Sequence, residues 1–105
     1  MSESLSDLAR DLAKVDRLIH EPARLTILTI LFVVESADFL YIKRETNLTK
    51  GNLSSHLYKL EEAGYVKIEK TYKGKIPLTV CSLTDKGHLA FENYRDQIKN
   101  FVEST

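Results

Sequence analysis

The sequence lacks the features on which disulfide-linked and membrane-spanning proteins depend. It has one cysteine, Cys81, which excludes an intrachain disulfide and suits a reducing interior. Its longest apolar run, from Leu25 to Val34, is too short to cross a bilayer and is interrupted by threonines. The N-terminus is polar and acidic, unlike a signal peptide. We therefore expect a cytoplasmic protein with no membrane partner.

The chain also lacks a net charge, because 15 basic residues balance 15 acidic ones. The charges are unevenly distributed: residues 1–42 carry a net charge of −3, residues 43–81 carry +4 and residues 82–105 carry −1. Screening limits each charge to about 10 Å of influence, so a local basic segment attracts phosphate even on a neutral chain. The +4 segment is therefore a candidate for nucleic-acid binding.

The stretch from Asn47 to Tyr65 has the signs of a short helix with one buried side. Thr49 is a suitable N-cap, and Gly64 stands where a left-handed glycine ends many helices. The apolar residues between them recur on one side at helical spacing; they are Leu53, Leu57 and Leu60. We expect these leucines to hold the helix against a core and to leave its other side exposed.

The exposed side of this helix carries small or hydrogen-bonding side chains, which suit the DNA major groove. Asn52 can bind adenine through two hydrogen bonds, while Tyr58 and Lys59 are placed to contact phosphates. The alternative is a polar face that only meets water, as in most amphipathic helices. The candidate DNA-binding residues of the helix are Lys50, Gly51, Asn52, Ser54, Ser55, Tyr58 and Lys59.

Two helices are predicted before this one. Pro22 suits a first helical turn, and the apolar residues after it predict a buried helix over residues 22–35. Residues 36–38 are expected to be a connection. Residues 39–45 predict a second helix, which a turn at Thr46 and Asn47 joins to the candidate reading helix. Two helices joined by a tight turn form a helix-turn-helix.

After Gly64 the periodicity changes from 3.6 to 2, which predicts a β-hairpin. The first strand covers residues 65–72, the turn is Lys73-Gly74-Lys75, and the return strand begins at Pro77 and ends at Leu83. A cationic hairpin beside a helix-turn-helix is a wing, whose lysines neutralise phosphates. An edge hairpin kept soluble by lysines is the alternative. The candidate DNA-binding residues here are Lys70, Tyr72, Lys73 and Lys75.

The two ends of the chain predict amphipathic helices over residues 5–19 and 85–103, on either side of a core at residues 22–83. Their apolar stripes either close the core of a single domain, residues 1–105, or meet another subunit. Together they exceed what one small domain can cover, so we expect a homodimer. The candidate dimer residues are Leu5, Leu8, Leu12, Val15, Phe91, Tyr94, Ile98 and Phe101.

The sequence holds no catalytic constellation and no glycine-rich phosphate cradle. Cys81 is alone, and His20, His56 and His88 lie far apart, which argues against a metal site, although a site shared across a dimer stays open. His56 flanks the leucine stripe and is expected to pack or hydrogen-bond within the domain. We therefore expect no enzyme activity, no cofactor and no metal.

Four separated motifs resemble landmarks of small winged-helix transcriptional regulators related to the MarR and ArsR families. The motifs are His20 to Leu25, Leu48 to Leu57, Leu60 to Val66 and Leu83 to Gly87. The resemblance covers roughly residues 15–95 and fits the elements predicted above. The expected fold class is mainly α with a β-hairpin, a winged helix-turn-helix with extra N- and C-terminal helices.

The resemblance implies a cytoplasmic homodimer that binds duplex DNA, with the reading helix at residues 50–63 and the wing at residues 66–82. The paired cysteines of ArsR-type metal sensors are absent, and the wing has lysines but no arginine. We expect a sequence-specific DNA-binding regulator, a repressor acting as a homodimer, with an effector that the sequence does not name. The rival is a winged-helix module that binds another protein in a larger transcription-related assembly.

Overall fold

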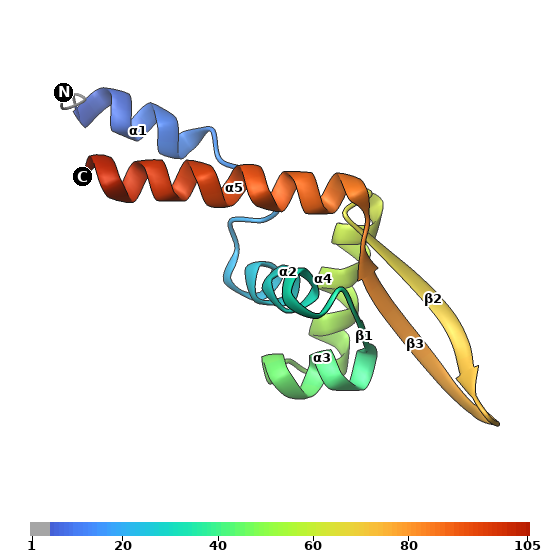
Figure 1. Cartoon of the computed structure of the whole chain (residues 1–105). Coiled ribbons are helices and arrows are strands. Elements are labelled where there is room, and N and C mark those ends of the chain that lie inside the picture. Colours follow the sequence, from blue (N-terminus) through green and yellow to red (C-terminus); the bar gives the residue numbers. More distant parts are fainter. Residues whose placement is uncertain (1–4) are drawn as a thin grey trace.

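The computed structural model describes residues 5–105 and arranges them as a mostly helical fold with one antiparallel sheet (Figure 1). The helices are α1 (Leu5–Ala13), α2 (Pro22–Val34), α3 (Phe39–Thr46), α4 (Lys50–Glu62) and α5 (Asp85–Ser104). The strands are β1 (Ser36–Asp38), β2 (Val66–Lys73) and β3 (Ile76–Leu83). This arrangement is a winged helix, so the predicted fold class is confirmed.

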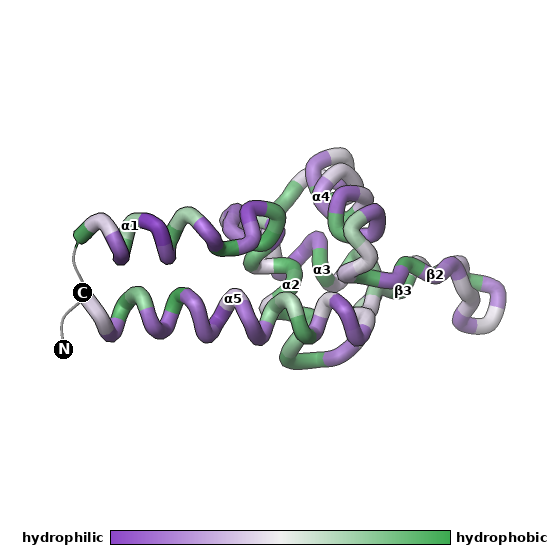
Figure 2. Tube along the Cα trace, turned by 90° about the horizontal axis from the view of Figure 1, so that it is seen from above, coloured by the Kyte–Doolittle hydropathy of each residue, from purple (hydrophilic) through white to green (hydrophobic). Residues whose placement is uncertain are grey.

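The sheet has the strand order β1-β3-β2, and both pairs are antiparallel. The prediction of a simple connection at residues 36–38 was wrong, because this segment pairs with β3, where Ala37 lies opposite Cys81. Three residues are too few to show a period of two, so local periodicity could not predict this strand. Beyond β1, the β2–β3 hairpin projects from the core (Figures 1 and 2).

The hydrophobic core lies between α2, α3, α4, the base of the sheet and the first half of α5. The predicted leucine side of α4 is confirmed as buried: Leu53 and Leu60 are fully buried and Leu57 is 2% exposed. The other members of the core cluster come from every neighbouring element. They are Val15, Ile19, Ile27, Leu28, Leu31, Ile42, Val66, Cys81, Phe91 and Tyr94.

Local capping explains where the predicted helices begin and end. The Thr49 hydroxyl accepts a hydrogen bond from the Asn52 amide at 3.1 Å, and the Thr84 hydroxyl accepts one from Gly87 at 2.9 Å. Gly64 follows α4 with a φ of 79°, the left-handed conformation expected of a glycine at this position. The caps predicted from the sequence are therefore confirmed for α4, and Thr84 caps α5 in the same way.

The predicted helix over residues 5–19 was wrong in its length, because α1 ends at Ala13. Residues 14–21, called the linker below, turn towards the core instead. The Asp16 carboxylate accepts hydrogen bonds from the amides of Leu18 and Ile19 at 2.9 and 3.3 Å, which replaces continued helical bonding. The turn buries Val15 and Ile19 in the core.

The two terminal helices run antiparallel and side by side, and their free ends extend beyond the core (Figures 1 and 2). The part formed by residues 5–13 and 97–104 is called the arm below. It gives the molecule its elongated shape, 60 × 25 × 21 Å. No helix among residues 5–105 has both the length and the apolar character needed to span a membrane.

Three of the predicted dimer residues fill the core of their own chain, which corrects that part of the prediction. Val15 and Phe91 belong to the core cluster, and the Phe91 ring lies 5.0 Å from that of Phe32. Tyr94 is 5% exposed, and its hydroxyl is 2.6 Å from Nδ1 of His20. These side chains are used inside the chain because α5 crosses the core before it reaches the arm.

Candidate nucleic-acid interface

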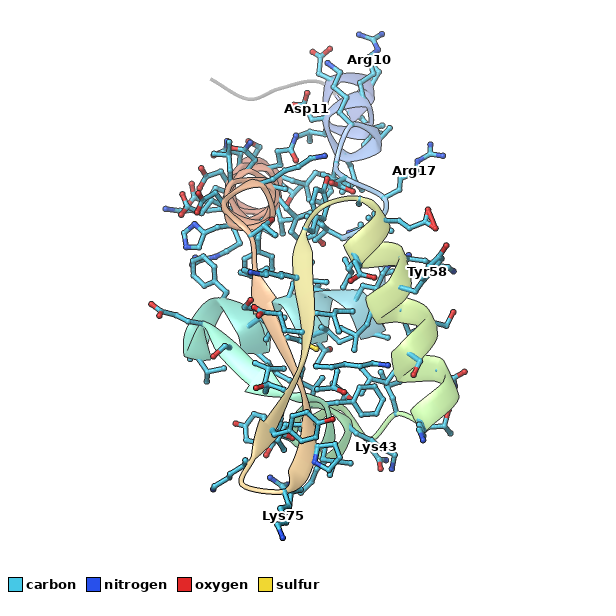
Figure 3. All side chains as sticks on the ribbon, turned by 90° about the vertical axis from the view of Figure 1, so that its right-hand side faces the viewer. Arg10, Asp11, Arg17, Lys43, Tyr58 and Lys75 are labelled. Atoms are coloured by element: carbon cyan, nitrogen blue, oxygen red, sulfur yellow. The ribbon has the colours of Figure 1, made fainter. Side chains whose placement is uncertain are left out.

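The outer side of α4 is the first part of the candidate site. All seven residues predicted there are exposed, and Figure 3 shows Tyr58 pointing away from the core. Gly51 has open space where a Cβ would be, so packing within the chain does not require a glycine at this position. The buried leucines fix the inner side of α4 and leave this polar side accessible.

The β2–β3 hairpin is the second part. Its turn is tighter than predicted, because Lys73 belongs to β2 and pairs with Ile76, while Gly74, with a φ of 64°, and Lys75 make the turn. Lys75 lies at the hairpin tip in Figure 3. Tyr72 lies opposite Pro77 across the hairpin, and its side chain is 71% exposed.

A groove of about 650 Å³ separates α4 from the sheet and brings the two parts together. Its apolar lining comes from Phe39, Leu57 and Ile68. Four of the predicted DNA-binding residues line it, three from α4 and one from β2: Lys50, Ser54, Tyr58 and Lys70. Residues from separate elements thus form one continuous surface, whose polar lining combines lysines and hydroxyl groups with the carboxylate of Glu61.

Comparison with known proteins gives this surface a context. The sequence matches the winged helix DNA-binding domain family over residues 23–102. The chain belongs to this family. The match includes α2 through most of α5, so it covers both the helix-turn-helix and the hairpin.

Two relatives with clear sequence similarity cover most of the chain. An uncharacterised protein of Methanocaldococcus jannaschii is 42% identical over 79 residues, covering 74% of this chain and 85% of that protein. A transcriptional regulator homologue from Pyrococcus horikoshii has a structure with a TM-score of 0.84 and 30% identity, covering 92% of this chain and 95% of that chain.

An ArsR family transcriptional regulator shares the fold more distantly, with a TM-score of 0.54 and 15% identity over 100% of this chain and 99% of that chain. The predicted resemblance to winged-helix transcriptional regulators is confirmed. The family is one of DNA-binding transcriptional regulators, a fold that is not enzymatic in general.

This winged-helix protein has a further basic residue beside the groove, Lys43, which the sequence reasoning did not include in the site, and Arg44 follows it in α3. Lys43, in the last turn of α3, lines a second groove together with Lys50 and lies near the hairpin end of the molecule (Figure 3). The Arg44 guanidinium carbon lies 5.6 Å from the centre of the Tyr41 ring. Lys43 and Arg44 are the first two residues of the +4 segment, and this position in the sequence could have marked them as candidate DNA-binding residues.

The charge along α4 changes sign from its beginning to its end. Lys50 stands in the first turn, whereas Glu61 and Glu62 stand in the last. A hydrogen bond to Glu62, and then the negative charge of that carboxylate, raise the pKa of the Tyr58 hydroxyl. The Tyr58 hydroxyl therefore lies in the acidic field at the end of α4, and phosphate is favoured nearer Lys50.

The inner side of α4 also carries a polar residue, His56, whose side chain is 21% exposed. Its Nδ1 lies 3.1 Å from Nη1 of Arg24 and 3.7 Å from a carboxylate oxygen of Glu21. The expectation that His56 is hydrogen-bonded within the domain is confirmed. Among residues 5–105, no group of three or more histidine, cysteine or acidic residues could hold a metal ion.

Glu21 caps α2 by accepting hydrogen bonds from the amides of Ala23 and Arg24, at 2.5 and 3.4 Å. Burial alone would raise the pKa of this carboxyl group. The hydrogen bonds from the two amides, together with the charge of Arg24, outweigh burial, so the net pKa is lowered. The sequence did not reveal this cap, because glutamate is an uncommon N-cap residue.

Proposed function

We propose that this winged-helix protein is a transcriptional repressor that binds specific duplex DNA sequences as a homodimer. In this proposal the outer side of α4 lies in the major groove, and the hairpin lysines contact the flanking phosphates. The observation that carries it is the shared groove, because Lys50, Ser54 and Tyr58 of α4 meet Lys70 of β2 around one surface.

The arm supports the homodimer. It keeps large apolar side chains in contact with water, including Leu5, which is 83% exposed, and Val102, which is 61% exposed. Leu12, Ile98 and Phe101 are partly exposed beside them. A second copy would cover this surface and would place two α4 helices on half-sites about 34 Å apart, one turn of DNA.

The test begins by selecting the tightest binders of the full chain from random duplex DNA. Binding to the selected duplex is then followed by fluorescence anisotropy from about 50 to about 200 mM salt. We expect a site with two related halves and an affinity that falls steeply with salt. No binding at the low end would contradict the proposal and favour the protein-binding alternative.

The hairpin is tested with the double variant Lys73→Ala/Lys75→Ala. Losing two phosphate contacts should weaken binding to all sequences and reduce the salt slope by about two units. The matched control is Arg17→Ala/Arg95→Ala, which removes two exposed basic side chains outside the arm, α4 and the hairpin. An unchanged slope in the hairpin variant would remove the hairpin from the interface.

The repressor role is tested by in vitro transcription from a promoter that overlaps the selected site. A bound dimer should block the polymerase, so the transcript should fall as the protein is added. A promoter with a scrambled site is the control. A transcript that rises instead would assign the protein as an activator.

A further inference from the structure

The linker contacts the back of α4 through Arg24, the third residue of α2. The Arg24 Nε donates a hydrogen bond to the Leu18 carbonyl in the linker at 2.6 Å, while its Nη1 lies 3.1 Å from Nδ1 of His56 in α4. The Arg24 side chain is only 12% exposed. One guanidinium therefore joins the linker, the start of α2 and the middle of α4.

A second contact joins the linker to the end of α4. The Tyr65 hydroxyl, one residue after Gly64, donates a hydrogen bond to the Asp16 carboxylate. The other oxygen of the same carboxylate accepts hydrogen bonds from the amides of Leu18 and Ile19. One carboxylate therefore shapes the linker and also attaches it to the residue that follows α4 and Gly64. Burial, then the hydrogen bond to Asp16, raises the pKa of Tyr65 to about 12.

The two contacts restrain α4 in a way that its leucines do not. Leu53, Leu57 and Leu60 bury one side of the helix, but apolar contacts are non-directional and tolerate small rotations and shifts. Hydrogen bonds are directional and weaken steeply when misaligned. Base reading needs side chains held close to one geometry, so directional contacts behind a reading helix matter for sequence discrimination.

The chemistry of the Arg24 contact also defines the state of His56. An arginine side chain only donates hydrogen bonds, so Nδ1 of His56 must accept and the ring proton must lie on Nε2. His56 thereby serves as an acceptor fixed to α4. Glu21, whose carboxylate lies 3.6 Å from the Arg24 Nη1, balances the positive charge of the guanidinium.

We infer that Arg24 and Tyr65 are positioning residues for DNA recognition: they fasten α4 to the linker at its middle and its end, and so set the angle at which α4 meets the bases. The inference rests on the proposed DNA-binding function. It also makes the linker the mechanical connection between the arm and α4, because the linker leads directly from α1 to these two contacts.

The test uses the full chain with the variants Arg24→Lys and Tyr65→Phe. The first keeps the positive charge and removes the planar fork, and the second removes only a hydroxyl group. Neither side chain belongs to the exposed candidate interface. The readout is the ratio of affinities for the selected duplex and for a scrambled duplex of equal length, measured together with the salt slope.

We expect each variant to lower this ratio about tenfold, comparable to the loss of one good base contact, with an unchanged salt slope because no phosphate contact is lost. The matched controls are Arg17→Lys, an exposed arginine of the linker (Figure 3), and Thr29→Val, which loses a side-chain hydrogen bond to the Leu25 carbonyl within α2. Both control variants should show the same ratio of affinities for the selected and scrambled duplexes as the protein without substitutions.

The inference is overturned by full discrimination in Arg24→Lys and Tyr65→Phe, or by an equal loss in Thr29→Val, which would reflect general destabilisation. Amide hydrogen exchange tests the positioning without DNA, because exchange in α4 should rise in the two variants and not in the controls. Unchanged exchange in α4 also overturns it. Failure of the unchanged protein to bind any duplex would instead contradict the proposed function.

Discussion

The winged core and the arm are parts of one chain, but they are stabilised very differently. The core buries a continuous cluster of thirteen residues drawn from helices, strands and the linker. In the arm, as far as residues 5–105 are described, Leu8 alone is buried, at 8% exposure. Since burial of apolar surface dominates folding energy, the core can hold its shape alone, whereas α1 depends on α5 and on whatever covers its outer side.

The largest expected effect comes from the joint between the two regions. A Cβ on Gly87 would lie 2.0 Å from the Tyr65 carbonyl oxygen, a backbone atom that cannot move aside easily. Gly87→Ala should therefore destabilise the protein by about 3 kcal/mol or more. Urea unfolding followed by circular dichroism measures this. A loss below about 0.5 kcal/mol would mean that α5 is not fixed to the core at this point.

Matched leucine substitutions compare the two regions directly. Leu53→Ala in the core should cost about 3 kcal/mol of unfolding free energy, because a fully buried side chain leaves a cavity. Leu12→Ala in the arm, where the side chain is partly exposed, should cost less than about 1 kcal/mol. It should instead raise the dimer dissociation constant about tenfold in sedimentation equilibrium. Equal losses of unfolding free energy in the two variants would contradict the proposed difference in stability between the core and the arm.

A glycine outside the joint should behave in the opposite way to Gly87. Gly51 has nothing within 4 Å of its Cβ position, and alanine is the better helix former, so Gly51→Ala should stabilise the protein by about 0.5–1 kcal/mol. The same change should weaken DNA binding about tenfold if backbone and phosphate approach closely at this position. Thermal unfolding and anisotropy test the two effects separately, and unchanged affinity would exclude the close approach.

The smallest effect concerns pH at the point where the linker meets the core. Because the pKa of Glu21 is lowered on folding, its carboxylate stabilises the fold above the unfolded pKa. That contribution is lost as the pH falls through the folded value. Between about pH 5 and about pH 3, the unchanged protein should lose more unfolding free energy than Glu21→Gln. If the unfolding free energies of both proteins fall in parallel with pH, the ionised Glu21 carboxylate does not contribute to stability.

Sequence patterns were sufficient where one helix or strand decided its own structure. The Thr49 cap, the leucine side and the Gly64 end located α4, because each depends on residues within a few positions of one another. The alternation after Gly64 located the hairpin for the same reason. The outer side of α4 followed from the buried side, so the candidate residues on it were all predicted to be exposed, as they are.

Patterns failed where a distant segment determined the outcome. The apolar stripe of residues 5–19 looked like one helix, but Val15 and Ile19 bury themselves in a core that the local sequence does not describe. Residues 36–38 form a strand only because β3 supplies the hydrogen bonds. Phe91 and Tyr94 looked like subunit contacts because nothing local indicates that α5 crosses Phe32 and His20.

The sequence by itself therefore determined the winged-helix fold class, the reading-helix candidate and the basic hairpin, since helical and strand periodicities and caps are local properties. Only the tertiary structure decided that α4 and the hairpin share one groove, that Lys43 borders it, and that the linker holds α4 through Arg24 and Tyr65. The physical reason is the same in each case: these features are contacts between segments far apart in the chain, and only packing brings such segments together.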